Sequence, residues 1–389
     1  MPHSKKIRSL FLPFLAFVVL LSGGVAVRAE PIPPPPQVPV RGYVLMDYQS
    51  GNLLANMKGD ERMEPASITK LMTAYVIYKA LKSGKIHLDD KVTITERAWK
   101  VVGSKMFVKV GTQVPVEDLL MGMVVQSGND ATVALAEHVA GSEETFVKLM
   151  NQETERLGLK GSHFTNAPGL PDANHYMSAR DIAVLTRALI RDFPEHYARY
   201  SVRGFKYNNI EQPNRNRLLF TDSSVDGVKT GHTESAGYCL VSSAKRNDTR
   251  LIGVVLGATK EKDRFQASEA LLNYGFSFFE SRKLYDGNTP IATSRIWKGK
   301  DNELPLGVAY PLYVTVPKGQ APQVSTTTTV QPKIVAPAQK DQPFGEIVVK
   351  LGDQEVSKTP LVALKEVPES GWFGRLLDSI LMFFYYLFH

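Results

Sequence analysis

The chain has 389 residues, 43% of them apolar, which is enough to bury a sizeable core and suggests about two domains. Lysine and arginine number 46 against 39 acidic residues, so the formal net charge is +7. This charge is spread along the chain without a long basic block or interleaved aromatic residues, which argues against a nucleic-acid-binding protein. With Cys239 as the only cysteine, an internal disulfide bond is excluded.

The first 29 residues have the three parts of a secretory signal peptide. MPHSKKIRS is basic, LFLPFLAFVVLL is apolar, and Val27-Arg28-Ala29 has the small-x-small form that signal peptidase cleaves. An uncleaved N-terminal anchor is the alternative, although the apolar run is short for a membrane span. In both cases we expect the rest of the chain to be exported. Residues 30–40, EPIPPPPQVPV, predict an extended proline-rich tether.

The next part of the chain is expected to combine a hairpin, a helical region and a second group of strands. Residues 43–59 alternate around a Ser-Gly-Asn turn, as in a β-hairpin. Helical periodicity predicts helices at residues 66–82, 117–125, 129–140, 143–157 and 178–192. Strand-like runs return between residues 203 and 259, and a helix is expected at 263–282. This order predicts an α+β domain at residues 41–285, in which an antiparallel sheet from both ends of the domain packs against a helical subdomain.

Two further segments complete the chain. Residues 286–367 contain short β-rich runs broken by proline and glycine, which predict a small all-β domain. Residues 368–389 predict an amphipathic helix. Its apolar face would carry Trp372, Phe373, Leu376, Leu377, Ile380, Phe383, Phe384, Leu387 and Phe388, and its other face Arg375, Asp378, Ser379, Met382 and Tyr386. The pattern is typical of a helix in the membrane interface; the alternatives are a membrane-spanning helix, which needs about 20 apolar residues, and a buried core helix.

The helix expected at residues 66–82 carries a serine and a lysine one turn apart near its start. On a helix Ser67 and Lys70 share a face, and a hydroxyl beside an amine is the minimum required for a serine nucleophile with lysine as its base. The same S-x-x-K spacing recurs at Ser242 and Lys245. That second pair lies in a predicted strand, where positions i and i+3 point to opposite faces, so the context favours the first pair.

Two further motifs follow in order along the chain. Ser127-Gly128-Asn129 lies in a turn between two expected helices, and Lys229-Thr230-Gly231 lies in an expected strand. The turn on its own is also explained as a helix cap by Asn129 or Asp130. Together, S-x-x-K, S-x-N and K-T-G in this order resemble the penicillin-recognising serine acyl-transferases. Within that group the chain is most similar to the low-molecular-mass penicillin-binding proteins that are D-alanyl-D-alanine carboxypeptidases, and the likeness covers residues 40–389, including residues 166–181, 214–220 and 225–244.

The resemblance implies an enzyme that removes the terminal D-alanine from peptidoglycan stem peptides ending in D-Ala-D-Ala. It would form an acyl-enzyme on Ser67 and be acylated by β-lactam antibiotics. Lys70 is the expected base, and desolvation together with the cation Lys229 should lower its pKa. Ser127 is expected to pass a proton to the leaving amine, and Asn129 to hold both the substrate amide and Lys70.

The remaining expected roles concern substrate binding. The backbone N–H groups of Ser67 and His232 would form the oxyanion hole, whereas the His232 imidazole is more typical of packing or gating than of catalysis. Gly231 should leave room for substrate backbone along the strand. The substrate carboxylate is expected to meet Lys229, Thr230 and Arg264, with Arg215 supporting the wall from behind. No cofactor is expected, and no metal, because the sequence has no cluster of metal-ligating residues.

Two other functions compete with this interpretation. A serine β-lactamase would usually carry S-D-N, and one of class A an E-x-x-L-N carboxylate, and we take both strings to be absent from this chain. A β-lactamase would also not need the β-domain and tail. A catalytically silent wall-binding scaffold would be signalled by loss of Ser67, Lys70 or Lys229, and all three are present. The balance between carboxypeptidase and endopeptidase activity is left open. The expected location is the periplasmic face of the cytoplasmic membrane.

Overall fold

The computed structural model describes residues 32–388, apart from the side chains of Tyr386 and Phe388. The expected signal peptide at residues 1–29 therefore lies outside the described residues. Residues 32–40 run without helix or strand. Within this segment Ile32, Val38 and Val40 pack against buried side chains of the first domain, and the Tyr274 hydroxyl donates a hydrogen bond to the Pro33 carbonyl over 3.0 Å.

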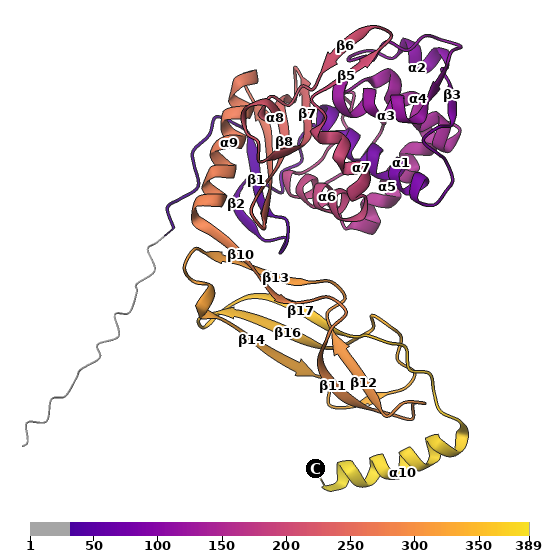
Figure 1. Cartoon of the computed structure of the whole chain (residues 1–389), viewed down its shortest axis with the longest axis vertical. Coiled ribbons are helices and arrows are strands. Elements are labelled where there is room, and N and C mark those ends of the chain that lie inside the picture. Colours follow the sequence, from indigo (N-terminus) through magenta and orange to yellow (C-terminus); the bar gives the residue numbers. More distant parts are fainter. Residues whose placement is uncertain (1–31, 389) are drawn as a thin grey trace, which may run out of the picture. The chain divides into compact units, whose positions relative to one another are not determined.

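A five-stranded antiparallel sheet forms the centre of the first domain (Figure 1). Its strands are β1 (Gly42–Asp47), β2 (Leu53–Met57), β7 (Val225–Thr233), β8 (Gly237–Arg246) and β9 (Thr249–Ala258). The order in space is β2-β1-β9-β8-β7, so the N-terminal hairpin pairs with strands that come about 200 residues later. The predicted hairpin and the predicted closure of the sheet from both ends are confirmed. Strand β7, which carries the K-T-G motif, lies at an edge of the sheet.

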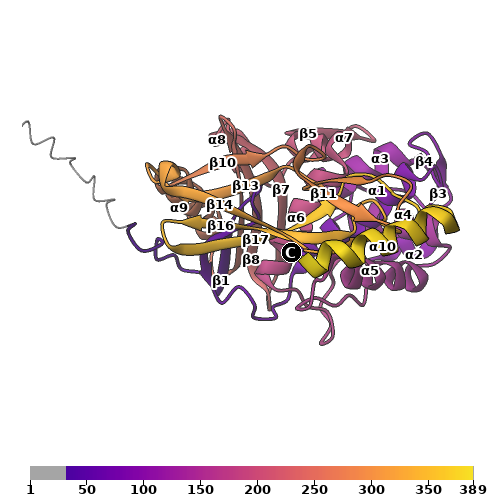
Figure 2. The same cartoon turned by 90° about the horizontal axis from the view of Figure 1, so that it is seen from below.

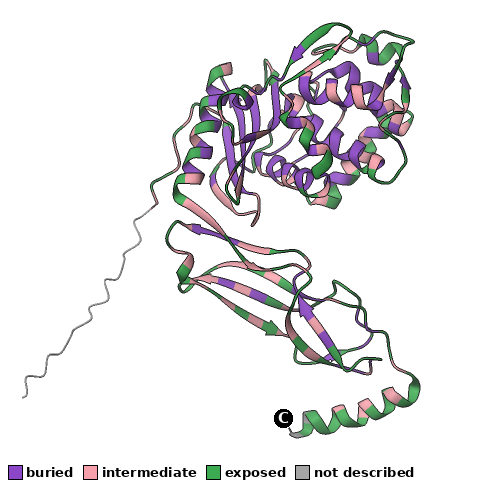
Figure 3. Ribbon diagram, in the orientation of Figure 1, coloured by how far each residue is buried: buried purple, intermediate pink, exposed green. Residues whose placement is uncertain are grey.

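Most residues of the central strands β1, β8 and β9 are buried, and these strands are largely purple in Figure 3. Successive side chains of a strand point to opposite faces. Accordingly Leu45 packs in a cluster with helix α9 (Glu261–Phe278), whereas Val44 and Met46 pack in the larger core of the helical subdomain. The sheet therefore has a helix on one side and the helical subdomain on the other.

The helical subdomain lies between the two groups of strands. Its helices are α1 (Lys70–Lys82), α2 (Glu96–Lys100), α3 (Val116–Met121), α4 (Asn129–Ala140), α5 (Glu143–Leu157), α6 (Ala179–Asp192), α7 (Pro194–Tyr197) and α8 (Leu218–Thr221). Short helical turns η1 (Ala66–Thr69), η2 (Gly122–Gln126) and η3 (Ala198–Ser201) and the strand pairs β3 (Lys91–Thr93) with β4 (Gln113–Pro115) and β5 (Gly204–Tyr207) with β6 (Ile210–Pro213) complete it.

The predicted helices 129–140 and 143–157 are confirmed with the bounds of α4 and α5. Three other predicted helices of the helical subdomain have different bounds. The one expected at 178–192 begins one residue later, at Ala179. The helix expected at 66–82 opens with the 3-10 turn η1, and the one expected at 117–125 gives way after Met121 to the π-helical turn η2. Such π-turns often occur at functional sites because they redirect the chain. Here η2 ends at Gln126, directly before Ser127.

The second domain is all-β, as predicted. Strands β10 (Phe279–Tyr285) and β13 (Leu312–Pro317) form a pair. Strands β11 (Pro290–Trp297), β12 (Glu303–Gly307), β14 (Val324–Val330), β15 (Ile334–Val335), β16 (Pro343–Leu351) and β17 (Gln354–Ala363) form a sheet in the order β14-β16-β17-β12-β11-β15. Figure 2 shows β14, β16 and β17 side by side. The helix predicted at 263–282 is too long at its C-terminal end. Helix α9 stops at Phe278, because residues 279–285 pair with a strand about 30 residues later.

Helix α10 (Trp372–Phe388) follows the second domain. Its length and position agree with the predicted C-terminal amphipathic helix. Within residues 32–388, none of the helices combines the length and the apolar character needed to cross a membrane.

Candidate active site

Three elements meet around a cleft of about 540 Å³ in the first domain. They are the start of the η1–α1 helix, the turn between η2 and α4, and the edge strand β7. The cleft is lined by Ser67, Ser104, Ser127, Pro213, Asn214, Arg215, Arg217, Thr230, Gly231, His232, Tyr238, Glu261 and Arg264. Of the predicted site residues only Lys70, Asn129 and Lys229 are absent from the lining, and all three are buried.

The Lys70 ammonium lies between three oxygen atoms. Its Nζ is 3.0 Å from Ser67 Oγ, 2.7 Å from Asn129 Oδ1 and 2.9 Å from the Pro168 carbonyl oxygen. Asn129 Oδ1 and the Pro168 carbonyl can only accept hydrogen bonds. A neutral amine has two hydrogens for these two acceptors, and its lone pair then points to the Ser67 hydroxyl. The geometry therefore suits Lys70 as the base that takes the proton of Ser67.

Burial lowers the pKa of Lys70 to about 7, because the side chain is only 1% exposed and loses the hydration of its charged form. Repulsion from Arg215 lowers this pKa further, while Asp130 opposes the shift. Arg215 is thus a cation that we had not expected in this role, in addition to the expected Lys229, whose repulsion with Lys70 acts on both lysines. Burial also holds the pKa of Lys229 well below its usual value, with Lys70 adding to the shift.

Strained backbone occurs at two points of the cleft. Ala66, directly before the nucleophile, has φ +47°, and Ser127 has φ +66°. Residues with a side chain rarely adopt this left-handed region, and such strain concentrates at functional sites. The Ser127 hydroxyl is buried and has no hydrogen-bond partner among the described residues. It is therefore free to bond to a group that enters the cleft.

The S-x-N turn does not cap α4 in the way we considered. Gly128 is the N-cap residue and makes no side-chain hydrogen bond. Asn129 instead uses its side chain between two segments, accepting from Lys70 and donating over 2.7 Å to the Val102 carbonyl. The Asp130 carboxylate binds the backbone of residues 106–108. Asn129 thus holds the cleft wall together, while Asp130 binds both this wall and the Ala131 backbone N–H in the first turn of α4.

Strand β7 forms the opposite wall. A Cβ on Gly231 would lie 2.9 Å from the Pro65 carbonyl oxygen, so this glycine is needed because η1 packs closely on the strand. We had expected it to leave room for substrate backbone. The His232 ring is exposed and stacks on Tyr238 with 4.0 Å between ring centroids. Because β7 is an edge strand, the substrate can still bind along its open side.

Arginine side chains gather at one end of the cleft. Arg264 is 4% exposed and packs over the rings of Tyr238 and Phe265, so it is not a solvated helix charge. Its Nε has no partner among the described residues. Arg215 lines the cleft directly, whereas we had expected it to support the wall from behind.

Glu261 is a lining residue that our sequence analysis missed. It accepts hydrogen bonds from Arg264 over 3.1 Å and from Arg217 over 3.4 Å. The spacing of three residues between Glu261 and Arg264 on one helix was the signal that could have found it. Its carboxylate holds one Nη of Arg264, and the other Nη donates to the Gly231 carbonyl over 3.4 Å.

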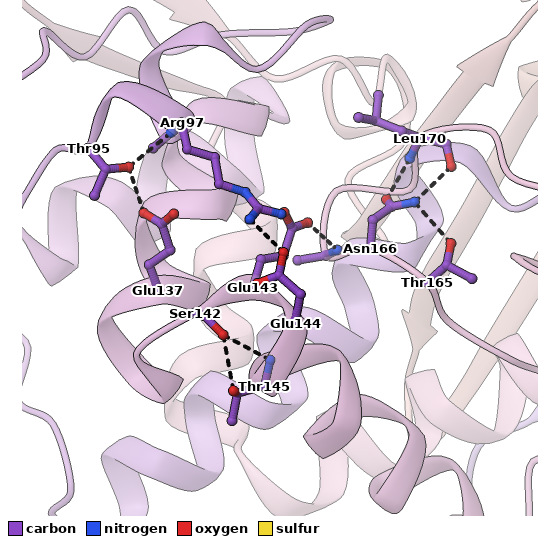
Figure 4. Close-up of polar contacts among 12 residues, drawn as sticks. Thr95, Arg97, Glu137, Ser142, Glu143, Glu144, Thr145, Thr165, Asn166 and Leu170 are labelled. Atoms are coloured by element: carbon purple, nitrogen blue, oxygen red, sulfur yellow. Dashed lines mark hydrogen bonds and ion pairs between the residues drawn. The ribbon is translucent and has the colours of Figure 1, made fainter.

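The loop that supplies the Pro168 carbonyl is fixed by a polar network, shown in Figure 4. The buried Glu143 accepts from the Ala167 backbone N–H over 3.0 Å and is paired with Arg97 over 2.7 Å. Asn166 Oδ1 accepts from the backbone N–H groups of Gly169 and Leu170, each over 2.8 Å. Gly169 has φ +86°, and a Cβ there would lie 2.0 Å from the Ala66 carbonyl oxygen. The network thus fixes this loop in close contact with Ala66, at the start of the η1–α1 helix.

Three sequence features are excluded from the site by their positions. Ser242 and Lys245 of the second S-x-x-K lie in strand β8, as predicted. Ser242 is buried, and its hydroxyl donates a hydrogen bond to the Gly253 carbonyl. Burial raises the pKa of the Cys239 thiol to about 11, which leaves it inert. The string E-x-x-L-N, which we had taken to be absent, does occur at residues 269–273. It lies within α9 with Glu269 exposed and outside the cleft lining, so it supplies no β-lactamase carboxylate.

Comparison with known proteins identifies two families along the chain. Residues 29–260 match the family model described as D-alanyl-D-alanine carboxypeptidase, and residues 279–369 match the penicillin-binding protein 5 C-terminal domain. The chain is 43% identical to the D-alanyl-D-alanine carboxypeptidase DacC of Escherichia coli K12, covering 96% of this chain and 95% of that protein. It is also 43% identical to DacA of Haemophilus influenzae, with 96% and 98% covered. The structure of penicillin-binding protein 5 from Haemophilus influenzae superposes with a TM-score of 0.79 at 44% identity, covering 86% of this chain and 99% of that one.

Proposed function

The chain belongs to the S11 peptidase family and is a serine-type D-alanyl-D-alanine carboxypeptidase, and from this premise we propose that Ser67 carries the acyl-enzyme. The substrate would be a peptidoglycan stem peptide that ends in D-Ala-D-Ala. Ser67 Oγ attacks the carbonyl carbon between the two alanines, the terminal D-alanine leaves, and water hydrolyses the ester. β-Lactam antibiotics would acylate the same oxygen.

The position of Lys70 is the observation that carries this proposal. Its two fixed acceptors, Asn129 Oδ1 and the Pro168 carbonyl, orient the amine so that the lone pair faces Ser67 Oγ. A pKa of about 7 makes the neutral form abundant at neutral pH. Lys70 therefore accepts the hydroxyl proton during acylation and, in our proposal, activates water during deacylation.

We assign the remaining steps to groups around the nucleophile. The backbone N–H groups of Ser67 and His232 stabilise the oxyanion of the tetrahedral intermediate. The unpaired hydroxyl of Ser127 passes a proton to the leaving amine of D-alanine. Asn129 holds Lys70 and the substrate amide.

The substrate carboxylate would bind at the cationic end of the cleft. Thr230 and Arg264 line this end, and Lys229 is buried beside them. A bound carboxylate favours the protonated form of Lys229, which burial otherwise disfavours. Arg264 and Arg215 both line the cleft, so their guanidinium groups add positive charge for a carboxylate. A site with this charge fits a peptide with a free C-terminus, whereas the β-lactamase and scaffold alternatives are not favoured by the family.

Mapping the acylated residue tests the assignment of the nucleophile. We expect labelled penicillin to modify the peptide that contains Ser67, and the Ser67→Ala variant to remain unlabelled. Ser242→Ala is the matched control, since it removes the serine of the second S-x-x-K, and its labelling should equal that of the wild type. A label on any other serine would contradict the proposal.

We further propose that α10 attaches the exported enzyme to the outer face of the cytoplasmic membrane, with the β-domain as a spacer. Its apolar side chains are exposed, among them Trp372, which is 72% exposed, and Phe383. On the other side of the helix, Asp378 accepts hydrogen bonds from the Lys298 backbone N–H over 2.6 Å and from Arg295 over 3.3 Å. A helix fixed by its polar side and apolar on its free side suits the membrane interface.

Deleting residues 369–389 should release the enzyme from membranes, while penicillin labelling stays at the wild-type level. Sedimentation of membrane fractions after signal cleavage measures this. As point variants, Ile380→Glu with Phe384→Glu should release the protein, whereas the matched control Ser379→Glu with Met382→Glu, which adds the same charge on the polar side, should remain bound. Membrane retention of the truncated enzyme would overturn the proposal.

A further inference from the structure

A second hollow of about 380 Å³ is formed by the chain segment that also contributes Ser104 to the active-site cleft. It is lined by Trp99, Lys100, Lys105, Phe107, Val108 and Lys109, which we call the lysine–aromatic patch. Trp99 is 43% exposed and Phe107 is 50% exposed. Exposed apolar side chains that lie together on a surface can mark a binding site.

The patch is continuous with the catalytic wall. The same segment contains Ser104, which lines the active-site cleft and whose carbonyl accepts from the Asn129 backbone N–H over 2.7 Å. A Cβ on Gly103, which has φ +93°, would lie 2.6 Å from Asn129 Nδ2. The chain therefore passes directly from the cleft into the patch, and a long substrate in the cleft can reach both.

Phe107 is held outward at an energetic cost. Its φ of +69° is in the left-handed region, which is unfavourable for an aromatic residue. The buried Asp130 carboxylate fixes this conformation by accepting from the backbone N–H groups of Met106 and Phe107, each over 2.9 Å, and of Val108 over 3.2 Å. Core packing does not explain the strain, because Phe107 is half exposed and is not part of the buried core.

The charge of the patch is only partly compensated. Lys100 pairs with Glu96, and the Lys105 ammonium donates to the Trp99 carbonyl. Lys109 is exposed and forms no ion pair with any residue in the range 32–388. Three cations against one carboxylate suit an anionic ligand, and the two rings suit a ligand that also has apolar faces.

We propose that the lysine–aromatic patch binds the peptidoglycan polymer beyond the D-Ala-D-Ala end. The C–H faces of its sugar rings stack on Trp99 and Phe107, and its carboxylates pair with Lys105 and Lys109. This inference rests on the proposed function, because the occupant is the rest of the same substrate. The patch thereby distinguishes a wall polymer from a short soluble peptide.

The test compares a polymeric with a short substrate. The variant Trp99→Ala/Phe107→Asn/Lys109→Gln removes both rings and one charge, and asparagine tolerates the left-handed backbone at position 107. D-Alanine release from a soluble tripeptide ending in D-Ala-D-Ala, and acylation by penicillin, should stay within about twofold of the wild type. Release from insoluble peptidoglycan with intact stems should fall about tenfold, with matching loss of co-sedimentation.

The matched control is Phe220→Asn/Lys85→Gln, which changes an equally exposed ring and an exposed lysine outside the patch, and it should behave like the wild type. Lys109→Gln alone tests the charge with no buried contact at risk, and should weaken polymer binding at low salt by about twofold to fivefold. Unchanged polymer activity in both patch variants would overturn the proposal. So would loss of binding to phosphatidylglycerol vesicles with polymer activity intact. Failure of the proposed function would show separately, as wild-type enzyme not acylated at Ser67.

Discussion

Replacing Lys70 by arginine is expected to lower the rate of acylation by penicillin about a thousandfold, the effect of removing a general base. A guanidinium stays protonated at every accessible pH, so it cannot accept the proton of the Ser67 hydroxyl. Arginine could still donate hydrogen bonds to Asn129 Oδ1 and the Pro168 carbonyl, which are the two fixed acceptors of Lys70. The variant thus keeps the charge and removes the lone pair.

The pH dependence of acylation by the wild type is a second test of Lys70 as the base. Lys70 acts as a base only when neutral, and its pKa is about 7. Acylation should therefore rise with pH and level off above about 7, falling about tenfold for each pH unit below. Lys79→Arg is the matched control: it makes the same change at the other end of α1, where Lys79 pairs with Glu153, and should leave the rate and the profile unchanged. Near-normal acylation by Lys70→Arg would remove Lys70 from the mechanism.

The sequence was sufficient for the side chains that carry chemistry. Ser67 and Lys70 could be paired because helical geometry places residues three apart on one face. The second S-x-x-K could be rejected because a strand does not. Three motifs in a fixed order then pointed to one family. The motifs are brought together in space by the pairing of β1 with β9 across about 200 residues. The sequence predicted that strands from both ends of the domain form one sheet, but not which strands pair.

Groups without a side-chain signature could not be predicted. The Pro168 carbonyl is the third partner of Lys70, but a backbone oxygen leaves no mark in the sequence. For Gly231 the structure adds a reason that the sequence could not give, since a Cβ there would lie 2.9 Å from the Pro65 carbonyl oxygen. Arg215 was expected behind the wall and lines it. Each of these depends on the distance between segments far apart in the chain.

The ends of helices could be predicted where nearby residues determine them, and not where distant strands do. Helix α5 was predicted correctly because its ends are local: Ser142 caps it by accepting from the Thr145 N–H, and Gly158 has φ +70° after its last turn. Helix α9 was predicted four residues too long because no local signal ends it at Phe278. Its end is set by the pairing of Phe279 with Pro317 in β13.

Replacing Asp130 by asparagine is expected to lower the stability of the first domain by about 3 kcal/mol. The carboxylate is buried and accepts four backbone N–H groups, those of Met106, Phe107, Val108 and Ala131. An amide keeps one acceptor oxygen and places an NH₂ group against the other two donors. Each buried donor left without a partner costs about 1–3 kcal/mol. Calorimetry should show a melting temperature lower by about 6–12 °C.

The same substitution should also move the activity profile, and in a direction that loss of stability alone does not give. Asp130 raises the pKa of Lys70 through its negative charge, so its removal lowers that pKa and favours the neutral base. The acid limb of acylation should therefore shift to lower pH, measured in the folded variant well below its melting temperature. Asp89→Asn removes one exposed carboxylate at a distance and should change neither quantity. A lower melting temperature with an unshifted pH profile of acylation would show that Asp130 stabilises the loop it binds but does not affect Lys70. An unchanged melting temperature would contradict the stabilising role of its four hydrogen bonds.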